Sequence, residues 1–220
     1  MLAHPIKASD VSHLTDARYF SAWEVEYIGF NLGPEGISST ELAAMLEWIQ
    51  GPKFIGELDA GLPGRLTANE AAQTALSNTP VDGFQVDAIF GVDNIKQLLS
   101  PLNRPVFLEF TVEGYADLDT IKDVVTEHAS VVEQILLNFK KGGIQWQDLL
   151  AGQPISIDAL AQMTEQFAIW MEIDGALPSE IMAALPSLKG LSVRGGSEEK
   201  VGFKDFDDLA DFFEDLEVEG

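Results

Sequence analysis

Cysteine is absent from this chain of 220 residues. Disulfide bonds, thiolate metal ligands and thiol nucleophiles are therefore excluded. Basic residues are scarce, because 13 lysines and arginines stand against 36 aspartates and glutamates, and the formal net charge is −23. A field of that sign repels polyanions, which argues against nucleic acid and anionic membranes as partners. A phosphate ligand would need a local exception to this charge.

Long hydrophobic runs are also missing. No stretch reaches the roughly 18 uninterrupted apolar residues that a membrane helix needs. The N-terminus, MLAHPIKASD, lacks the apolar segment of a signal peptide. Together these two absences predict a cytoplasmic protein. The sequence contains no Gly-rich dinucleotide fingerprint, nucleophile elbow or zinc motif, so we expect no cofactor and assign no metal ligand.

Short strand-forming runs alternate with longer helical patterns along the whole chain. This order is typical of repeated βα units around a parallel sheet. The expected strands are residues 3–8, 26–32, 53–58, 83–87, 105–110, 134–138, 168–173 and 188–193. Eight units without a linker between them predict one closed (β/α)8 TIM barrel over residues 1–220, in the α/β class. Its active site would lie at the carboxyl ends of the strands.

The segment 190–205, GLSVRGGSEEKVGFKD, resembles the last strand, phosphate loop and helix of phosphoribosylanthranilate isomerases. Weaker similarities to this family follow in the right order along nearly the whole chain. They are IKASDVSHLTDA at 6–17, YIGF at 27–30, GFQVD at 83–87, ILLN at 135–138 and DGALPSEI at 174–181. The resemblance implies the (β/α)8 fold and an isomerase of tryptophan biosynthesis, which rearranges an aminoaldose phosphate by Amadori chemistry.

The resemblance places Ser9 at the position of the family's catalytic cysteine and Asn138 at that of its catalytic aspartate. A serine hydroxyl is a weak base unless another group activates it, and an asparagine has no acidic proton to deliver. Each acid or base contributes roughly 10²–10⁴-fold in rate. We therefore expect the usual isomerase activity to be lost. Asp10, where the family has glycine, is the neighbouring carboxylate that could replace the base.

Four further positions correspond to substrate-binding positions of the family. Lys7 matches the family's lysine, Asp87 ends the fourth strand, and Ser192 stands where the family has aspartate. Glu35 replaces the arginine that the resemblance assigns to the anthranilate carboxylate. Like charges ~4 Å apart cost about 4 kcal/mol at an effective dielectric constant near 20, so Glu35 disfavours the usual substrate.

The phosphate site is better preserved than the acid and base. Glycines after the sixth, seventh and eighth strands offer backbone N–H groups to an anion, a short helix N-terminus is expected beyond the last of them, and an arginine adds charge. These residues are Gly142, Gly143, Gly175, Gly195, Gly196 and Arg194. Asp174, in contrast, puts a negative charge into the expected pocket.

Three functions stay open at this point. The leading interpretation is a barrel homologue that binds a small molecule, with phosphorylated ligands among the candidates, or a partner protein, and is either a monomer or a homodimer. The first alternative is an active isomerase in which Ser9 and Asp10 have taken over the acid and base roles. The second alternative is a different, metal-assisted enzyme on the same scaffold.

The metal alternative depends on carboxylates near the ends of strands. Asp10, Asp87 and Asp174 fall at or just beyond these ends, so a barrel would bring them towards one mouth. Further candidates are Asp59, Glu109 and Glu113. Oxygen ligands suit a hard divalent ion or another cation. The competing interpretation is that the aspartates cap helices.

Overall fold

A computed structural model describes residues 1–33, 36–58, 70–195, 198–200, 203–204 and 206–218. Eight parallel strands follow one another in hydrogen-bonded order, and β1 pairs with β8 to close the barrel. The strands are β1 Ile6–Val11, β2 Tyr27–Asn31, β3 Lys53–Leu58, β4 Gly83–Asp87, β5 Val106–Thr111, β6 Gln134–Asn138, β7 Ile169–Glu172 and β8 Gly190–Arg194. The predicted (β/α)8 fold is confirmed.

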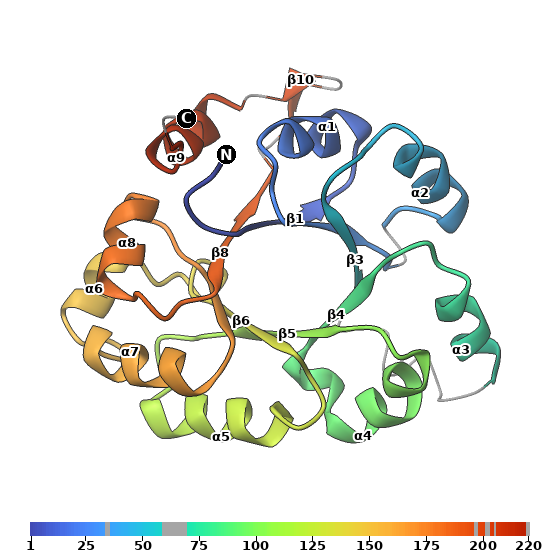
Figure 1. The fold of residues 1–220 in the computed structure, drawn as a ribbon. Helices are drawn as coiled ribbons and strands as arrows, with labels where there is room; N and C mark the ends of the chain where they lie inside the picture. Colours follow the sequence, from blue (N-terminus) through green and yellow to red (C-terminus); the bar gives the residue numbers. More distant parts are fainter. Residues whose placement is uncertain (34–35, 59–69, 196–197, 201–202, 205, 219–220) are drawn as a thin grey trace.

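Helices form a ring outside the barrel, and the N-terminus lies near the C-terminal helix α9 (Figure 1). The helices are α1 Leu14–Ala22, α2 Ser39–Leu46, α3 Glu70–Ser77, α4 Val92–Asn94, α5 Leu118–His128, α6 Trp146–Leu150, α7 Ile157–Gln166, α8 Pro178–Ala184 and α9 Asp207–Asp215. Between β8 and α9, β9 Glu198–Lys200 and β10 Phe203–Lys204 pair as an antiparallel hairpin. Our expectation of a short helix there was wrong for these residues.

The bounds of β3, β4 and β6 agree with the sequence prediction, whereas β1 begins three residues later than expected. Pro5 explains the later start, because proline has no N–H to donate to a strand ladder. Its carbonyl oxygen still accepts from the N–H of Leu191 at 3.2 Å. The shift is important for the site because it puts Ser9 and Asp10 within β1 instead of in the following loop.

Two of the expected helix starts are present in the structure. The Ser38 hydroxyl accepts from the Glu41 N–H at 3.3 Å, and the Glu41 carboxylate accepts from the Ser38 N–H at 3.1 Å, which completes a capping box. Pro178 is the first residue of α8, where its missing N–H costs nothing. The second predicted capping box begins at Thr67, which lies outside the described residues.

The core has two parts. The larger part fills the space between the strands and the helix ring. The smaller part lies inside the barrel and consists of Ile55, Phe107, Leu136 and Trp170, with Tyr27 packed against it. These five side chains project inward from among the first three residues of their strands, so they fill the interior towards the strands' amino ends. Polar side chains occupy the interior beyond them.

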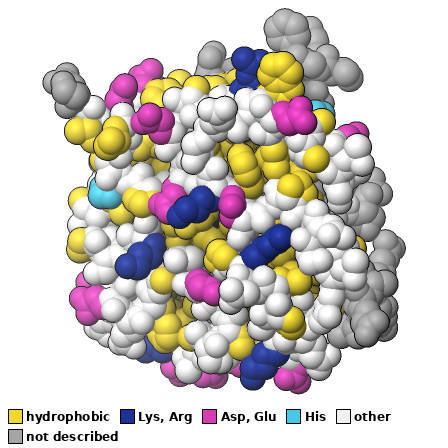
Figure 2. Space-filling model, turned by 45° about the vertical axis from the view of Figure 1, so that its right-hand side comes forward, with side chains coloured by type: hydrophobic (Ala, Val, Ile, Leu, Met, Phe, Trp, Pro, Cys, Tyr) yellow, Lys and Arg dark blue, Asp and Glu magenta, His cyan; other side chains and the backbone are white. Residues whose placement is uncertain are grey.

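The surface mixes charges of both signs. On the face in Figure 2, acidic and basic side chains lie interspersed with hydrophobic ones. Of three aromatic residues on or just after the first two helices, Phe20 is fully buried, Trp23 stacks on Phe213 and Trp48 is 69% exposed. In the described part of the chain, no helix is both long and apolar enough to cross a membrane.

Candidate functional site

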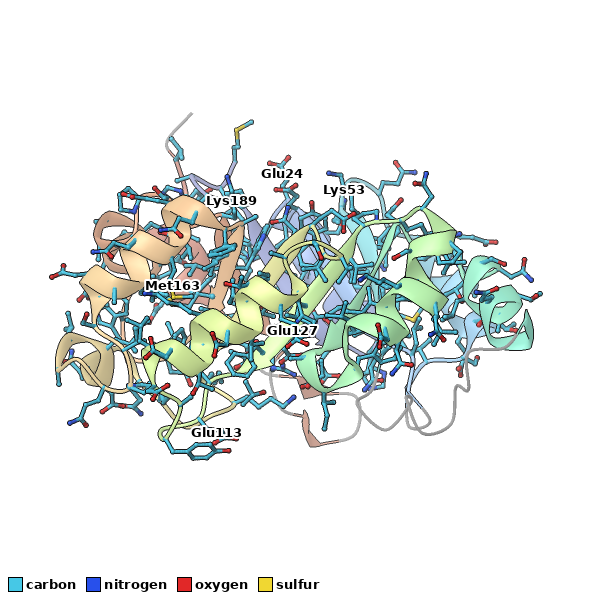
Figure 3. All side chains as sticks on the ribbon, turned by 90° about the horizontal axis from the view of Figure 1, so that it is seen from below. Glu24, Lys53, Glu113, Glu127, Met163 and Lys189 are labelled. Carbon is cyan, nitrogen blue, oxygen red and sulfur yellow. The ribbon has the colours of Figure 1, made fainter. Side chains whose placement is uncertain are left out.

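The candidate site lies at the mouth where the strands end. In the side view of Figure 3, Lys53 and Lys189 lie at one edge of the molecule and Glu113 at the other. Lys53 begins β3 and Lys189 directly precedes β8, whereas Glu113 follows β5. The edge carrying Glu113 is therefore the carboxyl end of the barrel, the end that carries active sites in this fold.

Inside the mouth, the four odd-numbered strands each contribute one charged side chain. These are Lys7 from β1, Glu57 from β3, Glu109 from β5 and Glu172 from β7. Their side chains are only 0, 12, 10 and 2% exposed, respectively. The interior of such barrels is filled by layers of four side chains from alternate strands, and these side chains are usually apolar. In this protein one such layer consists of charged side chains.

Ser9, the position of the expected base, belongs to a hydrogen-bonded cluster beneath the mouth. The Lys7 ammonium donates to the Ser9 oxygen at 2.6 Å and is ion-paired with Glu57. The hydroxyls of Ser9 and Ser192 lie 2.9 Å apart. Ser9 is fully buried, and among the described residues its side-chain partners are Lys7 and Ser192. This arrangement gives the hydroxyl a cationic donor instead of a base that could activate it.

Asn138, the position of the expected acid, bridges two carboxylates. Its amide nitrogen donates to Glu109 at 2.8 Å and to Glu172 at 3.1 Å. Its amide oxygen accepts from the backbone N–H of Lys141 at 2.8 Å. Both ends of this fully buried amide are therefore used within the protein. An amide is suited to this place because it can donate to two anions at once.

Arg194 joins the same carboxylates from β8. Its Nε donates to Glu172 at 2.8 Å, one Nη donates to Glu109 at 3.1 Å, and the other Nη lies 3.6 Å from Asp10. Burial alone would lower the pKa of Arg194, but Glu172, Glu109 and Glu57 raise it overall. The guanidinium is therefore held in its charged form and directed at residues of its own chain.

Glu172 is the least exposed carboxylate of the network. Burial raises its pKa, the charge and hydrogen bond of Arg194 act in the opposite direction, and the charge of Glu109 adds to the rise. The net direction is upward from the ordinary value of 4.5. Glu172 thus holds a proton more tightly in the folded protein than in the unfolded chain.

The raised pKa of Glu172 predicts a pH-dependent stability. Because the folded state binds this proton more tightly, the contribution of Glu172 to the free energy of unfolding decreases as pH rises from 4.5 through the folded pKa. Glutamine does not titrate, so Glu172→Gln lacks this loss of stability. The melting temperature of the variant should therefore rise relative to that of the parent as pH increases through this interval. Melting curves between about pH 4 and pH 8 test it. A difference in melting temperature that stays constant with pH would contradict the expectation. Glu165→Gln, at an exposed position of α7, controls for the loss of one charge.

A cavity of about 280 Å³ opens above this network. It is lined by Asp10, Asn31, Glu57, Leu58, Gln85, Val86, Asp87, Glu109, Lys141 and Arg194. Ser9 and Asn138 are not among the lining residues. The two positions that correspond to the family's base and acid therefore lie below the cavity wall.

Three lining residues explain the local shape of the mouth. Asp10 has a left-handed backbone, with φ of 56°, the conformation glycine adopts most easily, and the sequence resemblance aligns it with a glycine of the isomerase family. Asp87 caps the turn after β4 by accepting from the Ile89 N–H at 2.9 Å, in agreement with the capping interpretation. Gln85 donates to Glu109 at 3.1 Å, but its own side-chain oxygen is buried and has no partner among the described residues.

The glycines predicted for phosphate binding lie in the loops after β6, β7 and β8. Gly143 and Gly175 have φ of 74° and 93°, which glycine tolerates without strain. A Cβ on Gly142 would lie 2.8 Å from the carbonyl carbon of Val112, so the close packing of this turn accounts for that glycine. Gly195 follows β8 directly. Gly196 and Glu35 lie outside the described residues.

Three of the carboxylates considered for a metal line the same cavity: Asp10, Asp87 and Glu109. Asp174 pairs with Lys140 at 2.9 Å, and Asp87 is used as a cap. Within the described ranges, no group of three or more His, Cys, Asp or Glu side chains is placed to hold a metal ion. Asp59 lies outside those ranges.

Sequence reasoning missed Glu57 and Glu172 and named Glu109 only as a further candidate. One signal was available: glutamate interrupts a run of apolar residues in β3, β5 and β7, as in FIGEL and IWME. A strand that is buried on both faces is normally apolar throughout. A charge within such a strand therefore indicates a polar barrel interior.

Comparison with solved structures gives the fold. Phosphoribosylanthranilate isomerase from Thermus thermophilus is 20% identical, with a TM-score of 0.66 over 96% of this chain and 98% of that one. An isomerase solved with reduced 1-(o-carboxyphenylamino)-1-deoxyribulose 5-phosphate is 15% identical, with a TM-score of 0.65 over 97% and 98%. The glycerol uptake operon antiterminator regulatory protein of Listeria monocytogenes is 13% identical, with a TM-score of 0.56 over 90% and 96%.

No protein-family model matches the chain, and no curated protein matches it in sequence. At identities of 20% and below, the structural matches establish a shared barrel architecture. A barrel of this kind hosts different activities, as an isomerase and a regulatory protein among the matches illustrate. Function must therefore be argued from the residues at the mouth.

Proposed function

We propose that this protein is a barrel of the phosphoribosylanthranilate isomerase type that binds a small polar molecule at its mouth and does not catalyse the usual Amadori isomerisation. The observation that carries the proposal is the position of Ser9 and Asn138. Both are fully buried, both lie outside the cavity lining, and their side chains are hydrogen-bonded within the protein. A residue in such a position neither touches a ligand in the cavity nor exchanges a proton with it.

The composition of the cavity supports binding of a small molecule. Polar side chains from six strands converge on one concave space at the carboxyl end of the barrel, which is where barrels of this fold bind small molecules. A phosphorylated ligand is the less favoured class. Arg194, the cation predicted for the phosphate, already contacts Glu172, Glu109 and Asp10.

The decisive experiment follows the loss of phosphoribosylanthranilate fluorescence with purified protein. The unmodified protein is expected to give no turnover above the uncatalysed rate. Ser9→Cys/Asn138→Asp restores the family's base and acid, each worth roughly 10²–10⁴-fold in rate, and any gain would appear only in this variant. Melting curves of both proteins confirm that they are folded. Turnover by the unmodified protein would refute the proposal.

One contact favours a second candidate, an isomerase with altered acid and base residues. A carboxylate oxygen of Glu172 lies 3.1 Å from the Asn138 amide, beside the position of the family's acid, and burial raises the pKa of Glu172. Glu172 does not line the cavity either, so a movement of the wall would have to bring its carboxyl group to the substrate before it could deliver the proton that Asn138 lacks. In this case the unmodified protein would turn over substrate, and Glu172→Gln would lose that activity.

A further inference from the structure

We infer that the mouth cavity binds a small polyhydroxylated amine of the amino-sugar type, in preference to a neutral sugar or a sugar phosphate. The inference rests on the proposed function, which places ligand binding at the mouth. It adds the charge and the hydrogen-bonding character of the ligand. Four features of the described residues carry it: excess negative charge, cations that are already paired, an unused buried acceptor, and cavity volume.

The first feature is the charge of the wall. Four carboxylates line the cavity, and two cations do so. The carboxylates are Asp10, Glu57, Asp87 and Glu109, and the cations are Lys141 and Arg194. Immediately below them, Glu172 and Lys7 add one charge of each sign. Negative charges therefore exceed positive ones by two at this mouth, which favours a cationic ligand.

The second feature is that the cations have partners. Arg194 contacts three carboxylates, and the Lys7 ammonium is shared between Ser9 and Glu57. Lys141 lies 3.8 Å from Glu109 and is half exposed, so it is the described lining cation with the weakest internal partner. A phosphate would have to compete with carboxylates for these cations, whereas an ammonium group would join the carboxylates directly.

The third feature is the unused acceptor on the wall. Gln85 is only 3% exposed and lines the cavity, and its amide oxygen has no hydrogen-bond partner within the part of the chain that the structure describes. This oxygen has almost no accessible surface, so a ligand donor would reach it only after the side chain turns towards the cavity; a buried acceptor without a partner costs roughly 1–3 kcal/mol, which that contact would recover. The lining carboxylates also only accept hydrogen bonds. The wall thus favours a ligand rich in N–H and O–H donors.

The fourth feature is size. A cavity of about 280 Å³ lies at the lower end of the roughly 300–1,000 Å³ that small-molecule pockets span. A molecule with a single sugar ring is among the smallest ligands of such pockets, while a nucleotide or a peptide is much larger. Its lining is predominantly polar, so hydroxyl groups match it better than an apolar body.

The test compares three matched probes by titration calorimetry at fixed ionic strength: glucosamine, glucose and glucose 6-phosphate. Glucosamine is expected to bind about tenfold or more tightly than glucose, because one added positive charge faces the carboxylates. Glucose 6-phosphate is expected to bind more weakly than glucose. Added salt should weaken the binding of glucosamine and leave that of glucose nearly unchanged.

The variant Asp10→Asn tests whether the preference for glucosamine comes from the carboxylates that line the cavity. Asparagine also tolerates the left-handed backbone of this position, so the variant should fold while losing one lining charge. We expect it to lower the affinity for glucosamine by about tenfold and to lower that for glucose much less, because glucose carries no charge. Asp123→Asn removes the same charge at an exposed position of α5, on the outside of the barrel. It should change the affinity for neither glucosamine nor glucose.

Each other outcome overturns the inference. Equal affinity for glucosamine and glucose would refute the role of charge and leave a neutral sugar site. Tighter binding of glucose 6-phosphate would assign an anion site instead. Absence of glucosamine binding at millimolar concentration would refute the amino-sugar class. The proposed function fails by a separate result, turnover of phosphoribosylanthranilate by the unmodified protein.

Discussion

Replacing Arg194 by methionine is expected to lower the free energy of unfolding by about 3 kcal/mol, because breaking a buried ion pair leaves uncompensated charge behind. Arg194 contacts Glu172 at 2.8 Å, Glu109 at 3.1 Å and Asp10 at 3.6 Å. Its side chain is 30% exposed, so we use the lower end of the range for buried pairs. Methionine fills a similar volume, and the loss therefore reports on charge more than on packing.

Lys53→Met is the matched control for Arg194→Met. Lys53 pairs with Glu26 at 3.6 Å, but both side chains are well exposed, and such pairs contribute about 0–1 kcal/mol. Urea unfolding of both variants and the parent measures the two losses. The loss of unfolding free energy in Arg194→Met should also become smaller at low pH, because the carboxylates that no longer have Arg194 as a partner then accept protons. Equal small losses in both variants would show that Arg194 does not hold the network together.

The strands of this fold could be predicted from the sequence because each is a local pattern. β3, β4 and β6 have the expected bounds, and the Ser38 capping box lies where it was expected. These features depend on residues a few positions apart. The start of β1 could not be placed from its apolar run alone, because Pro5 decides where hydrogen bonding to the neighbouring strands begins.

The partners within the site could not be predicted, because barrel closure decides them. Lys7 and Glu57 are 50 residues apart, and Arg194 and Glu109 are 85 apart. The resemblance to the isomerase family supplied the positions of Lys7, Asn138 and Arg194. It gave no information on the glutamates that face them, since those come from other strands.

The amide of Asn138 suits the two carboxylates beside it better than a carboxylate would. Asn138 donates to both Glu109 and Glu172. An aspartate at that position would place a third carboxylate against these two, and close carboxylates disfavour one another's ionised form. Asn138→Asp should therefore keep a proton to unusually high pH, so the restored variant is best assayed over a range of pH.

Gly29→Ala is the second substitution with a large expected effect. A Cβ at this β2 position would lie 2.6 Å from the Glu57 side-chain carbon Cδ and 2.9 Å from the Lys7 ammonium nitrogen. Both side chains are enclosed in the barrel and paired with each other, so neither can move aside without breaking the pair. Overpacking costs about 1–3 kcal/mol, and disruption of the buried pair adds to it, so we expect a loss of about 3 kcal/mol.

Gly114→Ala controls for the intrinsic effect of replacing glycine. A Cβ there meets no atom of the described residues within 4 Å, and the expected effect of the substitution on the free energy of unfolding is within about 0.5 kcal/mol. Glu57→Asp shortens the crowded side chain, so the losses of Gly29→Ala and Glu57→Asp should be less than additive in the double variant. Urea unfolding of the four proteins and the parent measures this coupling. Full additivity would mean that Gly29 does not make room for the Lys7–Glu57 pair, and that the charged layer tolerates a neighbour at β2.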